Sequence, residues 1–511
     1  MKKDVRNATR LVRGSIWALI LILGLSGLLL QIQLVNRLDL DMSISVDEGE
    51  SLYSLQAVRL KRQLYHDWSV RPHVLSQYMP FFYLVPGVIA RFWGTDWLGT
   101  LAVGRAYVYV LWLGVGLMAY ALVRQSGGRR IVAAFAALLW FAGSLAPEYA
   151  DSFRPDSAMV FFSFAGVFFY QRSEQRGNVM LAALLLATAF LHKQSAICAA
   201  LAVGMDAFFQ RRLKTLAVML GTWTVGIGTV YCLAQVATSG AFEKNVWGSL
   251  LAWGGAQHVA IVLALAGLRG VAVFTGAGIA TAAGVGPRLL RLYFIIAIVL
   301  AITSSAKFGS GANYYLEAYA VGCVLTGILS NEWLTGSTRH AVGFQIAWLG
   351  LATAACLTAL GPRLVSAREL AGEIRDRRQI HKQIAEDWDR LINHLKILGD
   401  PQLIEDVYLA VRSGTNPVLV NASMFASMRQ SGRFDDGDIV RQIIAEGFKA
   451  IITTRPLNEA GGFRHFPDKW IELIRARYRL AERYELRAQN TTFYMYVPKP
   501  TGGETRAVRA D

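Results

Sequence analysis

The sequence contains little charge for its length. Only 17% of its 511 residues are charged, whereas 54% are hydrophobic, and the mean hydropathy is +0.34. A soluble globular protein typically has about 25% charged residues. This shortage of charge excludes an ordinary soluble protein, and the sequence therefore predicts an integral membrane protein.

Cysteine is also scarce. The four cysteines all lie inside apolar segments, at Cys198, Cys232, Cys323 and Cys356. In such positions they are typical of small buried hydrophobic residues, and their spacing provides neither a disulfide framework nor a metal-ligand motif.

Acidic residues are outnumbered by basic ones, which gives a formal net charge of +16. Nucleic acid is not needed to explain this excess, because the basic residues recur in short clusters at every second loop between apolar segments. That alternation is the positive-inside pattern of cytoplasmic loops. It predicts a cytoplasmic N-terminus and a C-terminus on the outer face. The clusters are Lys2 to Arg13, Arg124 to Arg130, Arg172 to Arg176, Arg211 to Lys214, and Arg288 to Arg291.

Long apolar runs predict about eleven membrane-spanning helices. The first run begins at Gly14 and has no Ala-x-Ala cleavage site, so we interpret it as a retained span rather than a signal peptide. Proline interrupts the segment 36–98 at Pro80 and Pro86, which predicts interfacial or re-entrant helices in a first outer loop. The spans are expected near 15–35, 99–123, 131–147, 155–170, 179–191, 195–209, 215–235, 257–285, 292–307, 315–330 and 341–360.

The composition changes near residue 361, where charged residues become dense and apolar runs of spanning length end. Residues 364–398 have the apolar spacing of a helix, and the runs PVLVNA, KAIITTR and NTTFYMYV are typical of strands. The fold class predicted is therefore mainly α: a polytopic transmembrane helical bundle in residues 1–360, followed by an extracytoplasmic α/β domain in 361–511.

Four polar clusters are expected at the outer ends of the spans. They are Asp47-Glu48, Arg154-Pro155-Asp156, a hairpin tip at His192-Lys193-Gln194, and the segment 307–317, KFGSGANYYLE. Ionisable groups at a membrane boundary are costly unless they face a cavity. Their placement on one side predicts a shared cavity.

The order of these motifs along the chain resembles a known family. Asp47-Glu48 is followed by Tyr65-His66-Asp67 and Pro80-Phe81-Phe82, and then by the Arg-Pro-Asp, Lys-Gln and Asn-Tyr-x-x-Glu elements. This ordered set resembles the bacterial GT-C glycosyltransferases of the protein mannosyltransferase and aminoarabinose-transferase branch. The resemblance implies a multi-pass enzyme of the bacterial inner membrane. It would move a sugar, with inversion, from a polyprenyl-phosphate donor to a hydroxyl of a lipid, glycan or protein acceptor on the outer face.

The resemblance also implies roles for individual residues. Asp47 would be the general base, and Glu48 would orient the acceptor or bind a metal ion. Cations would stabilise the departing phosphate. The remaining candidates are Lys193 and Arg154 for the phosphate, Asp156 for the sugar, and Asn313, Tyr314, Tyr315 and Glu317 as substrate-lining residues.

Simpler explanations exist for each candidate. Ser45 and Glu48 have capping-box spacing, so the acidic pair could cap a loop helix. Asp156 could favour a helix N-terminus, Lys193 could extend to the interface, and the tyrosines could belong to an aromatic belt. A divalent metal ion held by a carboxylate with His66, His73 or His192 stays open.

Two other functions stay open as well. A transporter or flippase of lipid-linked sugars is an alternative. Such a protein is expected to have charged residues near the middle of its spans, and Arg269 lies inside a predicted span. The sequence has no internal repeat or matching halves, however. A non-catalytic protein that binds a lipid carrier is the third possibility, and it would tolerate the loss of Asp47.

Overall fold

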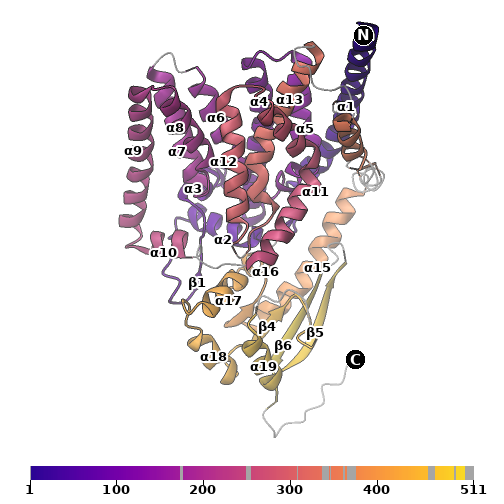
Figure 1. Cartoon of the computed structure of the whole chain (residues 1–511). Helices are drawn as coiled ribbons and strands as arrows, with labels where there is room; N and C mark the ends of the chain where they lie inside the picture. The colour runs from indigo at the N-terminus through magenta and orange to yellow at the C-terminus, as the bar shows by residue number, and fades with distance from the viewer. Residues whose placement is uncertain are drawn as a thin grey trace.

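The computed structural model shows a helical bundle with a smaller α/β domain packed against one end of it (Figure 1). It describes residues 2–500 apart from gaps at 46, 173–175, 249–254, 308, 336–344, 346, 359, 361–362, 365–375, 459–465 and 488–490.

Each predicted span coincides with a helix, although the number of membrane crossings stays a prediction. Among the residues that the structure describes, four helical stretches are long and apolar enough to cross a membrane: Arg13–Arg37, Trp97–Gln125, Leu213–Ala237 and Gly255–Ala282. The bundle helices are α1 (Lys2–Arg37), α4 (Trp97–Gln125), α5 (Arg130–Ala142), α6 (Asp156–Tyr170), α7 (Arg176–His192), α8 (Cys198–Phe209), α9 (Leu213–Ala237), α11 (Gly255–Ala282), α12 (Arg288–Ser304) and α13 (Leu316–Thr335). A short helix α10 (Ala241–Gly248) follows α9.

Two predicted spans differ in their bounds from what the structure describes. The span expected at 131–147 is too long, because α5 ends at Ala142, where Gly143 turns into extended backbone, and a 3₁₀ turn follows at Ala146–Tyr149. The span expected at 341–360 lies partly outside the described residues, which show a helix at Ala347–Thr358.

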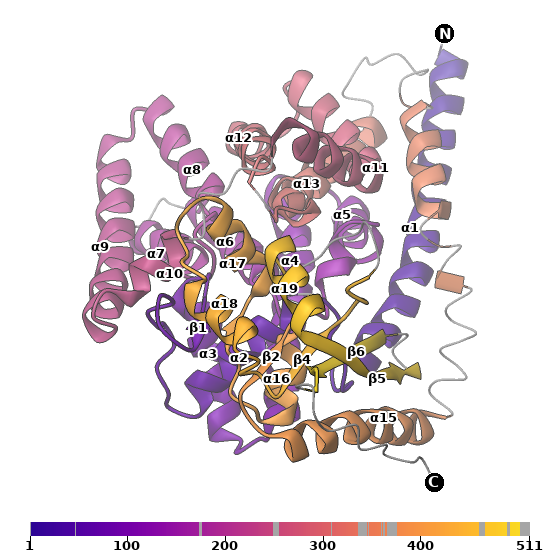
Figure 2. The same ribbon diagram turned by 90° about the horizontal axis from the view of Figure 1, so that it is seen from below.

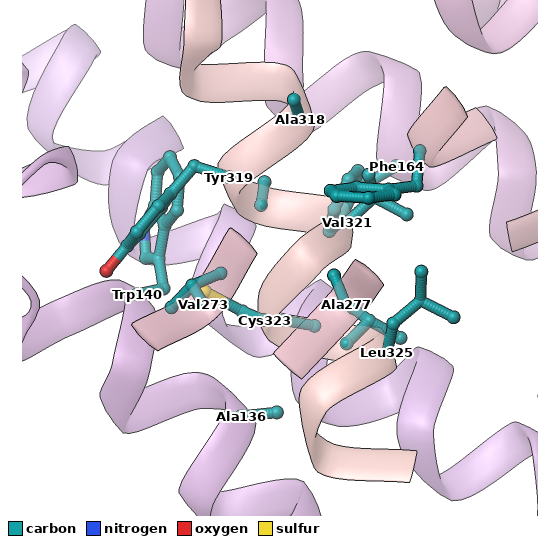
Figure 3. Packing of buried hydrophobic residues seen from close by; sticks show 14 of the residues in the cluster. Ala136, Trp140, Phe164, Val273, Ala277, Ala318, Tyr319, Val321, Cys323 and Leu325 are labelled. Carbon is teal, nitrogen blue, oxygen red and sulfur yellow. The ribbon is translucent and has the colours of Figure 1, made fainter. Parts of the chain in front are cut away.

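Helix α13 forms the centre of the bundle and is buried along nearly its whole length. Its side chains pack between α5 and α11, as Figure 3 shows for Tyr319 beside Trp140 and for Cys323 near Val273. The Tyr319 hydroxyl donates a hydrogen bond to the carbonyl of Leu139 at 2.9 Å, so this polar group is satisfied inside the apolar core. This packing fixes the start of α13, where part of the candidate site lies.

The segment 36–98 forms two helices, whereas their interfacial or re-entrant position stays a prediction. They are α2 (Glu48–Arg59) and α3 (Pro80–Phe92), with Pro80 in the first turn of α3, where a missing N–H costs nothing. A two-residue strand, β1 (His73–Val74), lies between them.

The C-terminal residues form the predicted α/β domain. Its sheet has the order β2-β4-β6-β5, with β2 and β4 parallel and the other pairs antiparallel. The strands expected from the sequence are present, whereas β2 and β5 were not expected. Of the helix expected at 364–398, residues 365–375 lie outside the described residues, and Arg377–Leu398 is helical. The elements are α15 (Arg377–Leu398), β2 (Gln402–Ile404), α16 (Val407–Ser413), β3 (Leu419–Val420), α17 (Ala422–Gln430), α18 (Gly437–Ile444), β4 (Ala450–Thr453), α19 (Asp468–Arg477), β5 (Tyr478–Leu486) and β6 (Thr491–Pro498).

This domain packs closely against the segment 36–98. The sequence did not predict that contact. Strand β1 pairs in parallel with β3, and α2 packs on α16. A Cβ atom on Gly49 would lie only 2.6 Å from the backbone nitrogen of Tyr408, so the two backbones can approach only because residue 49 is glycine. The buried ion pair between Asp41 and Arg412 strengthens the same contact.

Candidate functional site

A cavity of about 540 Å³ lies where the bundle meets the C-terminal domain. Figure 2, seen from below, shows α17 of that domain crossing the underside of the bundle. The cavity wall consists of Asp47, Gln77, Tyr78, Arg154, Lys193, Gln194, Ser195, Trp247, Thr303, Ser304, Lys307, Gly309, Asn313, Tyr314, Asn421, Ser423 and Met424. Five of the nine residues predicted for the site are in this wall: Asp47, Arg154, Lys193, Asn313 and Tyr314.

Asp47 occupies the N-cap position of α2, but its carboxylate makes no capping hydrogen bond. Its Oδ2 lies 3.2 Å from Nη2 of Arg154, and 37% of its side chain is exposed. The capping-box alternative is not formed, since the Glu48 carboxylate accepts from Ile44 N–H and is otherwise turned toward Arg105. The Asp47 carboxylate therefore lies in the cavity wall, paired with Arg154 and partly exposed to a ligand there.

Asp156 holds three neighbouring polar groups in place. As the first residue of α6, it is buried with its carboxylate near the helix N-terminus, where negative charge is favoured. Its Oδ1 accepts from Lys193 Nζ at 2.5 Å and from Asn313 Nδ2 at 3.0 Å. Its Oδ2 lies 3.7 Å from Nε of Arg154. Asp156 thus positions residues that line the cavity, and Lys193 also lies over the Tyr314 ring, 4.9 Å from its centroid.

Lys307 adds a further cation to the cavity wall. It follows the end of α12 and precedes a turn in which Gly309 has a φ of +76°, a conformation that favours glycine. Burial lowers the pKa of Lys307 to about 8, and repulsion by Lys193 adds to this effect. Lys307 belongs to the segment 307–317 that the sequence indicated, although it was not singled out there.

Glu48 lies outside the cavity wall. Its carboxylate is fully buried and accepts two hydrogen bonds from Arg105, at 2.9 Å from Nε and 2.7 Å from Nη2. Its two oxygens also accept the backbone N–H groups of Ile44 and Phe153 at 2.8 and 2.9 Å. With every lone-pair direction in use, this geometry offers no oxygen to an acceptor sugar or a metal ion. Arg105 lies inside α4, and nothing in the sequence marked it as a partner.

Tyr315 and Glu317 are also placed away from the cavity wall. The Tyr315 hydroxyl accepts from Ser305 Oγ at 3.3 Å in the core. Glu317 is buried and accepts from the Tyr293 hydroxyl at 2.6 Å. Both side chains therefore belong to the packing between α12 and α13 in this structure.

The three histidines considered as metal ligands lie in different surroundings. His73 Nε2 is 3.3 Å from Asp438 Oδ2, and His192 Nε2 is 2.6 Å from the Tyr107 hydroxyl. His66 lines a separate surface pocket beside Lys244. Among the residues that the structure describes, no group of three or more His, Cys, Asp or Glu side chains could hold a metal ion.

The other motifs in segment 36–98 support the local structure. The Tyr65 hydroxyl donates to the carbonyl of Tyr78 at 2.9 Å, and Phe82 stacks on Phe153 with ring centroids 4.4 Å apart. Asp67 forms an exposed ion pair with Lys244 outside the cavity. These residues fix the segment that carries Asp47 and Tyr78.

The C-terminal domain contributes Asn421, Ser423 and Met424 to the cavity wall. Asn421 caps α17 by accepting from Met424 N–H at 2.9 Å, and it donates to the Glu50 carboxyl at 2.5 Å. Burial raises the pKa of Glu50 well above its usual range, and the nearby Asp47 raises it further. Roughly 370 residues separate Asn421 from Glu50 in sequence, and no sequence signal linked them.

Comparison with known proteins identifies the fold. No protein-family model matches the chain, and no curated protein matches it in sequence. Crystal structures of ArnT from Cupriavidus metallidurans are similar over nearly the whole length. The form bound to undecaprenyl phosphate is 14% identical, with a TM-score of 0.59 over 94% of this chain and 98% of that one. The apo form is 16% identical, with a TM-score of 0.58 over 92% and 98%.

The Archaeoglobus fulgidus oligosaccharyltransferase is a more distant match, 11% identical with a TM-score of 0.48 over 85% of this chain and 69% of that one. The likeness to ArnT shows that this chain has the GT-C fold of membrane glycosyltransferases. With its apolar helices, it is an integral membrane protein.

Proposed function

We propose that this protein transfers a sugar from a polyprenyl-phosphate carrier to an acceptor hydroxyl on the outer face of a bacterial inner membrane. The observation that carries the proposal is one cavity that holds the accessible carboxylate of Asp47 together with Arg154, Lys193 and Lys307. Glycosyl transfer from a lipid phosphate needs a base and cations in one place. The solved structure of ArnT with undecaprenyl phosphate supports this choice of donor.

In the proposed reaction, the acceptor oxygen forms a bond to the anomeric carbon while the bond from that carbon to the phosphate oxygen breaks. The hydroxyl proton goes to Asp47, and the electron pair of the broken bond leaves with the polyprenyl phosphate. Displacement in one step inverts the configuration at the anomeric carbon. Arg154 forms an ion pair with the Asp47 carboxylate at 3.2 Å and so fixes its place in the cavity wall.

The cations act on the leaving group. Lys193 is held by Asp156 and Tyr314, so its position does not have to be organised during the reaction. Lys307 shares the same cavity wall and provides charge for the phosphate. Glu48 acts at a distance in this proposal, because its ion pair with Arg105 fixes the first turn of α2 and hence Asp47.

Asp47→Asn tests the proposal. Asparagine keeps the size of the side chain but cannot accept the proton, and loss of a general base typically lowers the rate by ~10²–10⁴. Membrane lipids and envelope glycans from cells with and without the protein identify the product by mass spectrometry. Purified variants then give transfer rates and undecaprenyl phosphate affinity separately.

The matched control is Asp67→Asn, which removes an exposed carboxylate of the same segment that lies outside the cavity. We expect Asp47→Asn to bind undecaprenyl phosphate normally and to transfer almost no sugar, whereas Asp67→Asn transfers at the normal rate. Normal transfer by Asp47→Asn would refute the assignment of the base. Failure of the wild-type protein to bind undecaprenyl phosphate would refute the proposed function itself.

A further inference from the structure

Gln194 leaves one hydrogen-bond acceptor unused in the cavity wall. Its Nε2 donates to the carbonyl of Gln77 at 3.0 Å, which fixes the orientation of the amide, since a carbonyl oxygen can only accept. Its Oε1 is buried and has no hydrogen-bond partner among the described residues. A buried carbonyl without a hydrogen-bond partner carries a desolvation cost. A ligand hydroxyl would remove that cost, and Gln194 directly follows Lys193, the proposed phosphate-binding residue.

The charges around the cavity are almost balanced. Lys193 pairs with Asp156 at 2.5 Å, and Arg154 pairs with Asp47 at 3.2 Å. Lys307 forms no ion pair with any carboxylate in the part of the chain that the structure describes. The Glu50 carboxyl contacts Asn421 behind the wall, and burial raises its pKa well above its usual range, so it adds little negative charge. The described cavity therefore has one cation in excess, that of Lys307.

A sugar linked to a polyprenyl phosphate through a phosphodiester bears one negative charge. That charge matches the single unpaired cation and leaves none to balance a charge on the sugar. We infer that the donor sugar is an uncharged, hydroxylated sugar, with one hydroxyl donating to Gln194 Oε1. This inference rests on the proposed function and names the class of its substrate.

Charged sugars fit this cavity less well. An ammonium group on the sugar would add a second unpaired cation beside Lys307, whose own ammonium is already disfavoured there, as its pKa of about 8 indicates. A carboxylate on the sugar would need a further free cation. Placed at Gln194 Oε1, it would also bring two hydrogen-bond acceptors together.

The test compares donors that share a ring and differ in charge. Three kinds of donor compete with labelled undecaprenyl phosphate for the purified protein: an undecaprenyl-phosphate-linked hexose, amino-hexose or hexuronic acid. Each kind is tested in the gluco, galacto and manno series. In at least one series we expect the neutral donor to bind about tenfold more tightly than both charged donors, which corresponds to about 1.4 kcal/mol. A charged donor that binds as tightly as the best neutral one would overturn the inference and leave the proposed function intact.

Two variants test the role of Gln194 directly. Gln194→Met keeps the length of the side chain but removes the acceptor, and we expect a roughly tenfold loss for the neutral donor with unchanged affinity for undecaprenyl phosphate. Gln194→Glu supplies a carboxylate, and we expect it to shift preference toward the amino-hexose donor. Equal loss for undecaprenyl phosphate and for the neutral donor in Gln194→Met would show a structural role only. If undecaprenyl phosphate does not bind the wild-type protein, the proposed function fails and the inference fails with it.

Discussion

Removal of the Glu48 carboxylate should destabilise the protein far more than removal of the neighbouring Asp47 carboxylate. Glu48 and Arg105 are both completely buried, so Glu48→Ala leaves a guanidinium group in the interior without its counter-charge. Breaking a buried pair in this way typically costs 3–5 kcal/mol. Loss of the acceptor for the N–H groups of Ile44 and Phe153 acts in the same direction.

The difference in the free energy of unfolding between the two variants can be measured in mixed micelles by titration with a denaturing detergent. We expect Glu48→Ala to lose about 3 kcal/mol or more, whereas Asp47→Asn, which breaks a partly exposed pair, loses about 1 kcal/mol or less. The double variant Glu48→Met with Arg105→Leu should lose less than the sum of its single changes, because neither charge is then left alone. If Glu48→Ala unfolds like the wild type but has lost sugar transfer, Glu48 has the acceptor-orienting role that the sequence suggested.

Three further predictions follow from the same structure. Donor binding should be strongest well below pH 8 and weaken as the pH rises through the lowered pKa of Lys307, because binding needs the ammonium form. Lys307→Met should remove this step from a pH titration of undecaprenyl phosphate affinity. Gly49→Ala should separate the C-terminal domain from α2, because the added methyl would lie 2.6 Å from the backbone nitrogen of Tyr408. Limited proteolysis should then cut the domain faster, and an unchanged rate of cleavage would contradict the close contact. In a cysteine-free background, an impermeant thiol reagent on intact cells should label Leu480→Cys but not Arg129→Cys; the opposite result would place the cavity on the cytoplasmic face.

The sequence was sufficient for the parts of the fold that depend on local pattern. Apolar runs located the bundle helices, because a helix that faces lipid or a core must be apolar over its length. Strands β4 and β6 were found by their β-branched and aromatic residues, whereas β5 has charged residues on its exposed face, in the run YRLAERYEL, and was missed. The boundary of α5 was missed because Gly143 ends the helix inside an apolar run.

The site was only partly accessible from the sequence, because its residues come from distant segments. The order of the motifs along the sequence was enough to propose five residues that the cavity brings together: Asp47, Arg154, Lys193, Asn313 and Tyr314. The sequence alone does not show, however, which of two adjacent acidic side chains faces the cavity. On a helix, neighbours point in directions about 100° apart, so Asp47 faces the cavity while Glu48 faces α4.

The participation of α17 in the cavity has a consequence for biosynthesis. The chain is made and inserted from its N-terminus, and the residues that line the cavity from the bundle are in place long before Asn421, Ser423 and Met424 are translated. Until then the cavity lacks the wall that α17 provides, and water can reach Asp47 from that side. Under the proposed function, we therefore expect a chain that still lacks α17 to hydrolyse a lipid-linked sugar rather than transfer it. Once α17 has been translated and packed against the bundle, it closes that side of the cavity, and in the proposed reaction the acceptor hydroxyl can then compete with water.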